Sequence, residues 1–275
     1  MDLQKANEHL REFYSVIGKK AEASAGKQLK VGVDLGTANI CIAVLDGDNR
    51  PVTGELYPAS VVRDGLVVDY IGAVEIVKTL KGRIESRLGT KLEFANAAVP
   101  PGTVGKNAMA VVNVVQSADM QIGYVVDEPT AAANVLDIEN GAVVDVGGGT
   151  TGISIIRDRQ VIASHDQATG GGHMTLVLAG NRGISISEAE KIKLDKNNHR
   201  DIFLVIRPVI EKMASIVNGF IRDYDVDTIY VVGGASSFDG FDEVFEKECR
   251  KRVIKPDHGL LVTPLGIAML DSEEK

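Results

Sequence analysis

Tryptophan is absent from this 275-residue chain, and aromatic residues make up only 5% of it. Flat aromatic platforms that stack on sugars or nucleic-acid bases are therefore not expected. No apolar stretch approaches the roughly 20 residues that a membrane helix needs. Basic residues are also few: 30 against 38 acidic ones give a net charge of −8. This surplus of acidic residues argues against a nucleic-acid-binding protein, because phosphate contacts require positive charge.

Cysteine is almost missing as well. Cys41 and Cys249 are the only two, and neither belongs to a Cys-x-x-Cys pair. A disulfide framework and a structural zinc site therefore lack support. Cys41 lies in an apolar run, where a small buried side chain is expected. The N-terminus shows no basic segment followed by an apolar one, so we expect no signal peptide and a cytoplasmic protein.

Residues 1–18 carry an amphipathic pattern of their own. Apolar side chains recur at spacings of three and four, which is typical of one helix face: Leu3, Ala6, Leu10, Phe13 and Ile17. Gly18 ends the pattern, and residues 19–27 have the composition of a flexible linker. We therefore treat 1–28 as a helix with a linker. Two interpretations stay open, namely docking on the chain's own body and docking on a partner protein.

From residue 29 onward, strand and helix patterns alternate, which predicts an α/β fold with buried sheets. A strand pair is predicted within 29–45 and another within 141–156. Both pairs contain the same motif, Val33-Asp34-Leu35-Gly36-Thr37 in the first and Val144-Asp145-Val146-Gly147-Gly148-Gly149-Thr150 in the second. The repetition predicts two similar halves with a cleft between them.

Each motif places an aspartate before a glycine turn. Glycine lets backbone N–H groups approach a phosphate closely. Asp34 and Asp145, facing one another, would suit Mg²⁺ held mostly through water, or orient a hydrolytic water. One motif alone fits an ordinary hairpin, but two at equivalent positions favour a phosphate site. The candidate phosphate-binding residues are Gly36, Thr37, Ala38, Asn39, Gly147, Gly148, Gly149 and Thr150.

Two further glycine segments follow. In 229–236 a strand runs into Gly233 and Gly234, a pattern that brings backbone close to a nucleoside. The other, 168–173, contains Gly171 and also fits a simple loop before a helix.

The order of these motifs resembles the actin/Hsp70/sugar-kinase ATPases. The run Glu128-Pro129-Thr130-Ala131-Ala132-Ala133 and the run Thr263-Pro264-Leu265-Gly266-Ile267-Ala268 resemble the two connecting motifs of Hsp70. Within this superfamily the chain is most similar to the Hsp70-like proteins of ethanolamine utilization. That similarity is carried by residues 62–67, 94–102, 168–183 and 207–214. The resemblance covers residues 28–270.

The resemblance implies a duplicated actin-like ATPase (ribonuclease-H-like) fold, with two halves around a nucleotide cleft. Domain I would span 29–140 together with a returning C-terminal helix at 264–275, and domain II would span 141–263. Asp34, Glu128 and Asp145 would be catalytic, and Asp34 and Asp145 would hold Mg²⁺ largely through water. ATP would bind both glycine turns, with Gly171, Gly233 and Gly234 toward the nucleoside.

The chain departs from the Hsp70 pattern in several ways. No counterpart of the catalytic lysine can be assigned, and Ser236 and Ser237 stand where an arginine usually stacks on adenine. The stretch 184–198 leads almost directly into a long helix pattern, so the upper subdomain of the second half is reduced. The basic residues Arg182, Lys191 and Lys193 fit a solvated surface better than a site.

The resemblance implies an accessory or chaperone protein that binds ATP and Mg²⁺ and has at most weak ATPase activity. It would assist microcompartment assembly or the maintenance of ethanolamine ammonia-lyase. Its partner would be a shell or cargo protein bound through the N-terminal helix, in the cytoplasm or at the microcompartment. The alternative is a nucleotide-inactive scaffold or interaction module on the same fold. A small-molecule kinase is disfavoured because no sugar-binding insertion is present.

Overall fold

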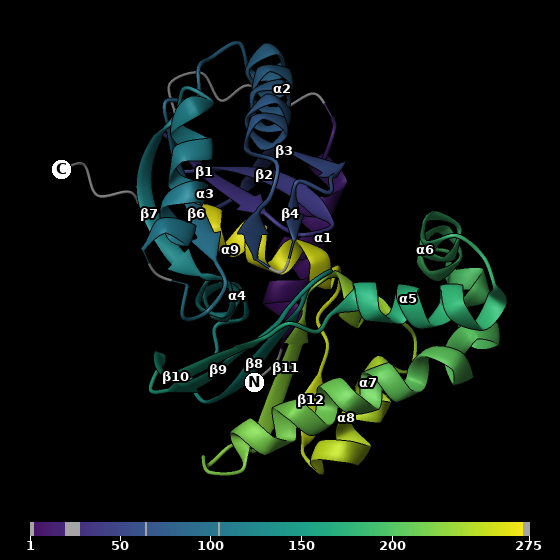
Figure 1. Cartoon of the computed structure of the whole chain (residues 1–275). Helices are drawn as coiled ribbons and strands as arrows, with labels where there is room; N and C mark the ends of the chain where they lie inside the picture. Colours follow the sequence, from purple (N-terminus) through teal and green to yellow (C-terminus); the bar gives the residue numbers. More distant parts are fainter. Residues whose placement is uncertain (1–2, 20–27, 64, 104, 272–275) are drawn as a thin grey trace.

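Two five-stranded sheets build two lobes, one above the other in Figure 1. The computed structural model describes residues 3–19, 28–63, 65–103 and 105–271. The predicted linker at 20–27 and the last four residues of the predicted C-terminal segment lie outside these ranges. Within the described chain no helix combines the length and the apolar character needed to cross a membrane.

Lobe I has the strand order β3-β2-β1-β6-β7. The helices α2 and α3 pack on this sheet, and a small hairpin, β4–β5, precedes α2 (Figure 1). The elements of this lobe are β1 (Leu29–Leu35), β2 (Asn39–Asp46), β3 (Pro51–Pro58), β4 (Val62–Arg63), β5 (Leu66–Val67), α2 (Tyr70–Leu88), β6 (Phe94–Val99), α3 (Lys106–Ser117) and β7 (Gln121–Asp127).

Lobe II repeats the same plan with the order β10-β9-β8-β11-β12. In both lobes the first three strands are antiparallel and the last two add in parallel. The elements are β8 (Gly141–Val146), β9 (Thr151–Arg157), β10 (Gln160–Gln167), α5 (Gly171–Arg182), α6 (Ile186–Leu194), η1 (Lys196–Asn198), α7 (His199–Ile221), β11 (Thr228–Val232), η2 (Gly234–Ser237), α8 (Phe241–Cys249) and β12 (Arg252–Ile254). Only α6 and η1 separate α5 from α7, which is the reduced upper subdomain that the sequence predicts.

The central strands form because their side chains are apolar on both faces. All six residues of β8 and seven of the eight in β2 are buried, as expected for strands that are covered on both sides. The sequence pattern did not predict β3 or β10. β3 begins and ends in proline and contains Gly54, whereas β10 is an edge strand with mostly polar, exposed residues. Both form because they extend an existing antiparallel pair.

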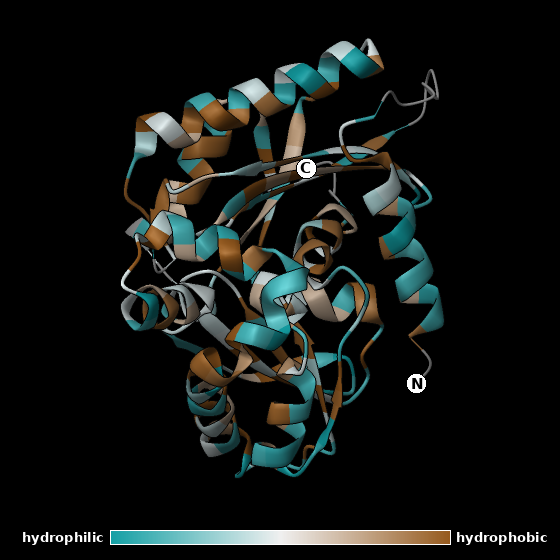
Figure 2. Cartoon of the chain, turned by 90° about the vertical axis from the view of Figure 1, so that its right-hand side faces the viewer, coloured by the Kyte–Doolittle hydropathy of each residue, from teal (hydrophilic) through white to brown (hydrophobic). Residues whose placement is uncertain are grey.

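The described interior contains one core for each lobe, a third core at the seam between them, and a small fourth cluster of Ala98, Ala131 and Ile267. The seam core joins Cys41 and Leu45 of β2 to Val143 of β8 and Tyr230 of β11. Two helices cross there, α4 (Glu128–Leu136) and α9 (Val262–Ala268), which η3 (Gly259–Leu261) precedes. Figure 2 shows the apolar strands enclosed by helices whose outer turns are hydrophilic.

The crossing of α4 and α9 is very tight. A Cβ at Gly266 would overlap the carbonyl oxygen of Ala131. Glycine at this position therefore lets the two helix backbones touch.

The N-terminal helix α1 (Gln4–Val16) docks on its own chain. Leu10 and Phe13 are completely buried in the seam core. The Phe13 ring lies over Gly54, where a Cβ would come within 2.8 Å of it. Just beyond the helix, Ile17 forms a bridge with Gly54. Of the two interpretations left open by the sequence, docking on the chain's own body is the one observed.

Candidate functional site

The two predicted phosphate turns face one another across the lobes. The first turn connects β1 to β2, and the second connects β8 to β9. A Cβ at Gly148 would lie 3.0 Å from the Cβ of Ala38 and 3.3 Å from its backbone nitrogen. The two turns are therefore in direct contact, whereas the repeated motif predicts a cleft between the two halves.

Three carboxylates from both lobes gather beneath these turns. Asp34 lies on β1, Asp145 on β8, and Glu128 is the first residue of α4. Burial, reinforced by the negative charge of Asp145, raises the pKa of Asp34 to about 7. Burial also raises the pKa of Glu128 well above its usual range, and Asp145 and Asp34 add to the effect. The three groups repel one another because they share a poorly hydrated space.

Asp145 is held in place by lobe II and by the first turn of α9. Burial raises the pKa of this carboxyl, whereas a hydrogen bond from the Thr263 hydroxyl, 2.6 Å from Oδ2, opposes the rise. Its other oxygen lies against Gly233, where any Cβ would overlap it. Gly233 has φ +86, a conformation that favours glycine. The Gly-Gly turn predicted to approach a nucleoside thus packs directly on the carboxylate cluster.

The first turn of α5 closes another side of the site. The backbone N–H groups of Gly171 and Gly172 donate to the carbonyl oxygens of Gly147 and Gly148, at 2.9 and 2.7 Å. A Cβ at Gly171 would also lie 3.1 Å from that of Ala235. Gly171 therefore joins the second phosphate turn to the Gly-Gly turn through close packing. Its own N–H is engaged with Gly147 in this arrangement.

Lys193 lies beside the candidate site, a position that the sequence interpretation missed. Its ammonium group is largely buried and donates to the Gly171 carbonyl at 3.0 Å and to the Thr175 hydroxyl at 2.8 Å. Glu190 pairs with it at 2.8 Å and also contacts Thr175. The interpretation of Lys193 as part of a solvated basic cluster is therefore wrong. Its spacing of three from Glu190 on one helix was the available signal.

Family models match two parts of the chain. The model described as Hsp70 protein matches residues 68–200, and the model described as type IV pilus assembly protein PilM matches residues 139–263. The ethanolamine utilization protein EutJ of Escherichia coli is 41% identical over 253 residues, which are 92% of this chain and 89% of that protein. The chain belongs to the EutJ family.

A solved EutJ structure agrees with this assignment. The crystal structure of EutJ from Carboxydothermus hydrogenoformans is 48% identical, covers 98% of this chain and 100% of its own, and superposes with a TM-score of 0.92. MreB5 of Spiroplasma citri bound to AMPPNP shares the fold at 17% identity and a TM-score of 0.68, covering 87% of this chain and 94% of its own. The predicted actin-like ATPase fold in two halves is confirmed.

The structure gathers the predicted residues of this EutJ family member around one seam, but their roles as ligands stay predictions. Gly36, Thr37, Ala38 and Asn39 lie in and beside the first turn, and Gly147, Gly148, Gly149 and Thr150 in the second. Gly234 is exposed at the outer end, against Leu260. In the described ranges no three His, Cys, Asp or Glu side chains converge in a metal-binding arrangement.

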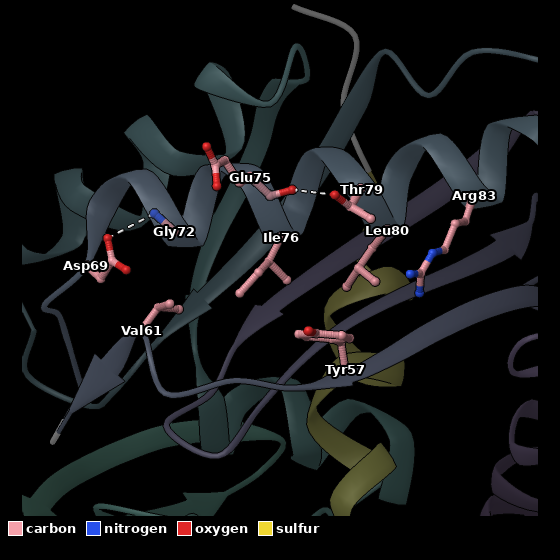
Figure 3. A pocket seen from close by; sticks show the side chains of 9 residues that line it. All are labelled: Tyr57, Val61, Asp69, Gly72, Glu75, Ile76, Thr79, Leu80 and Arg83. Carbon is pink, nitrogen blue, oxygen red and sulfur yellow. Dashed lines mark hydrogen bonds between the residues drawn. The ribbon is translucent and has the colours of Figure 1, made fainter.

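A separate surface cavity of about 380 Å³ lies in lobe I (Figure 3). Tyr57 of β3 and Val61 form one side, and α2 contributes Ile76, Leu80 and Arg83 to the other. None of the predicted site residues lines it.

Proposed function

We propose that this EutJ family protein binds ATP with Mg²⁺ between its lobes and acts as an Hsp70-like accessory protein of ethanolamine utilization. The proposal rests on the cluster of the buried Asp145 with the half-buried Asp34 and Glu128, drawn from both lobes. Neighbouring buried carboxylates with raised pKa values repel one another unless protons or cations neutralise them. A divalent cation would relieve this repulsion, and the donor set, oxygen only, suits Mg²⁺.

The surrounding groups suit the remaining parts of a nucleotide. Backbone N–H groups of the two glycine turns would bind phosphate oxygens, with Mg²⁺ neutralising phosphate charge beside Asp34 and Asp145. Lys193 and Glu190 would provide one cationic and one anionic side chain toward the nucleoside end. With Mg²⁺ bound, Asp34 would be ionised, and its carboxylate would order the water shell of the ion or orient a hydrolytic water. An ATP hydrolysis assay measures whether turnover accompanies binding.

Calorimetric titration with ATP and Mg²⁺ tests this proposal directly. The wild type should bind, and Asp145→Ala should lose most of the affinity. Asp223→Ala, at a highly exposed aspartate, serves as the matched control. At about 100 times its dissociation constant, the ligand should also add about 2.7 kcal/mol to the unfolding free energy. Absence of binding by the wild type, with and without Mg²⁺, would overturn the proposal.

The alternative is a nucleotide-inactive interaction module on the same fold. It is supported by the contact between Gly148 and Ala38, because nucleotide could enter only after the turns separate. Ser236 and Ser237 stand where the Hsp70 pattern has an adenine-stacking arginine, and this difference also supports the alternative. Intact partner capture by a wild-type protein that binds no nucleotide would favour this alternative.

We further propose that cleft opening and closing assists microcompartment assembly or the maintenance of ethanolamine ammonia-lyase, with shell or cargo proteins as partners. The apolar face of α1 is buried in its own chain, so a partner would have to use its exposed outer face or release it. Co-purification of shell and cargo proteins with the full chain and with a chain lacking residues 1–28 tests the partner site. Unchanged co-purification would exclude α1 as the tether.

A further inference from the structure

The helix α1 is anchored firmly on lobe I. Leu10 and Phe13 fill the seam core, and the Phe13 ring occupies the space left by Gly54 of β3. The Gly18 N–H donates to the Gly54 carbonyl at 2.9 Å, so the chain after the helix adds a backbone contact. His9 contacts the Asn49 carbonyl in the turn before β3 at 2.6 Å. This side of α1 is therefore fixed to one lobe by both packing and hydrogen bonds.

The other side of α1 holds residues 257 and 258, which follow β12 of lobe II. The Arg11 guanidinium donates to Asp257 at 2.6 Å. The Asp257 backbone N–H donates to Asn7 Oδ1 at 2.9 Å. The Tyr14 ring stacks on His258 with centroids 4.2 Å apart. Three different side chains of one short helix thus contact two consecutive residues of the other lobe's returning chain.

The held segment reaches the candidate site within one residue. Gly259 follows His258, and its carbonyl accepts the N–H of Gly233 at 3.0 Å. Gly233 in turn lies against the carboxylate of Asp145. The Cβ that Gly259 lacks would crowd the Ser236 hydroxyl at 2.9 Å, so this loop fits the Gly-Gly turn closely. A continuous set of contacts therefore runs from α1 to the floor of the cleft.

We propose that α1 is an intramolecular strap that couples the state of the cleft to the N-terminal segment. Docked α1 holds residues 257–259 against the Gly-Gly turn and ties lobe I to lobe II. Release of α1 frees that loop and loosens the nucleoside end of the site. Because coupling is reciprocal, a ligand that tightens the cleft also tightens α1 on the body. The coupling to ligand rests on the proposed nucleotide function, whereas the mechanical link does not.

The variant that tests the strap removes two of the three side-chain contacts with residues 257 and 258, those of Arg11 and Tyr14, and leaves the hydrogen bond to Asn7. Arg11→Ala combined with Tyr14→Ala keeps Leu10 and Phe13, so α1 stays anchored to lobe I. Both side chains are mostly exposed, so folding should be unaffected. The matched control is Lys5→Ala with Glu12→Ala, two exposed residues of the same helix. Hydrogen exchange of the unliganded full chain gives one readout, and dissociation of a fluorescent ADP analogue with Mg²⁺ gives the other.

In the strap variant, the amides of Gly233 and residues 259–261 should exchange at least about fivefold faster than in the wild type and the control. The analogue should dissociate faster by about fivefold or more, in the range typical of coupled sites. Unchanged exchange at these amides would overturn the strap. Faster exchange with unchanged dissociation would overturn its coupling to the cleft. If no form of the protein binds the analogue, the proposed function fails, and the exchange result alone decides the mechanical link.

Discussion

At the scale of single residues, the carboxylates beneath the two turns make folding stability depend on pH. Asp34 titrates at 3.8 in an unfolded chain and at about 7 in the fold. Between these values the folded protein holds the proton that the unfolded chain has lost. Stability therefore falls as the pH rises toward and through 7, the opposite of an ion-paired carboxylate.

The unliganded wild type should thus be less stable at pH 8 than at pH 5. Each pH unit in this window corresponds to about 1.4 kcal/mol, so the contribution of Asp34 is on the order of 2–3 kcal/mol. Denaturant melts of wild type and Asp34→Asn at both pH values measure it. The variant should lose the part that Asp34 contributes, while the raised pKa values of Glu128 and Asp145 leave a dependence of the same sign. Asp48→Asn, at an exposed aspartate, should retain the full dependence. Equal pH dependence in all three proteins would contradict the assignment.

Lys193 makes a second prediction at this scale. Substitution by methionine keeps the length of the side chain but leaves the Gly171 carbonyl and Glu190 without their cation. If the site takes nucleotide, affinity should fall about 10- to 100-fold, because a buried charged hydrogen-bond donor is lost. Lys191→Met, two residues away and exposed, is the control. Titration calorimetry separates them, and equal affinities would place Lys193 outside the binding site.

At the scale of elements, the crossing of α4 and α9 depends on one missing side chain. Gly266→Ala would drive a methyl group into the Ala131 carbonyl and push the helices apart. We expect a loss of at least about 1–3 kcal/mol, the usual cost of overpacking. Gly180→Ala in α5, with no atom within 4 Å of the new Cβ, should instead stabilise by about 0.5–1 kcal/mol. Thermal melts compare the two, and equal effects would contradict the tight crossing.

Helices and strands with a pattern in their own sequence can be predicted, whereas strands that depend on pairing with a neighbour cannot. α1, β2, β8 and α7 show strong local periodicity or apolar runs, and the sequence predicts each of them. β3 and β10 have no such pattern, and each is an edge strand that pairs with one neighbour, β2 and β9 respectively. Their formation therefore depends on that pairing. The docking site of α1 includes Gly54 of β3. Because no sequence pattern predicts this strand, the docking site cannot be predicted either.

The same distinction applies to the candidate site. Asp34 and Asp145 could be found because their motif occurs twice, and repetition is visible in sequence. Lys193 is less visible: the sequence shows only its spacing from Glu190, whereas its burial depends on Gly171, 22 residues away, at the start of a helix that packs on the second turn. Charge alone gave the wrong interpretation, since Lys191 beside it is exposed.

At the scale of the whole molecule, the shared seam core determines how the protein unfolds. Residues of both lobes, together with α1, α4 and α9, form this third core. Neither lobe can lose its structure without exposing apolar surface of the other. We therefore expect a single cooperative transition, with equal calorimetric and van't Hoff enthalpies. Two resolved transitions in scanning calorimetry would show that the lobes unfold independently.

The touching backbones of α4 and α9 also limit how the lobes can move. Two helices in contact at one point, with no side chain between them at Gly266, have no room to slide toward each other. They can still turn about that contact. We therefore expect the lobes to move relative to one another by rotation about the seam, with the largest displacements at the parts of each lobe farthest from it. The tips of α2 and α6 are thus the places where spectroscopic labels would report that rotation with the greatest sensitivity (Figure 1).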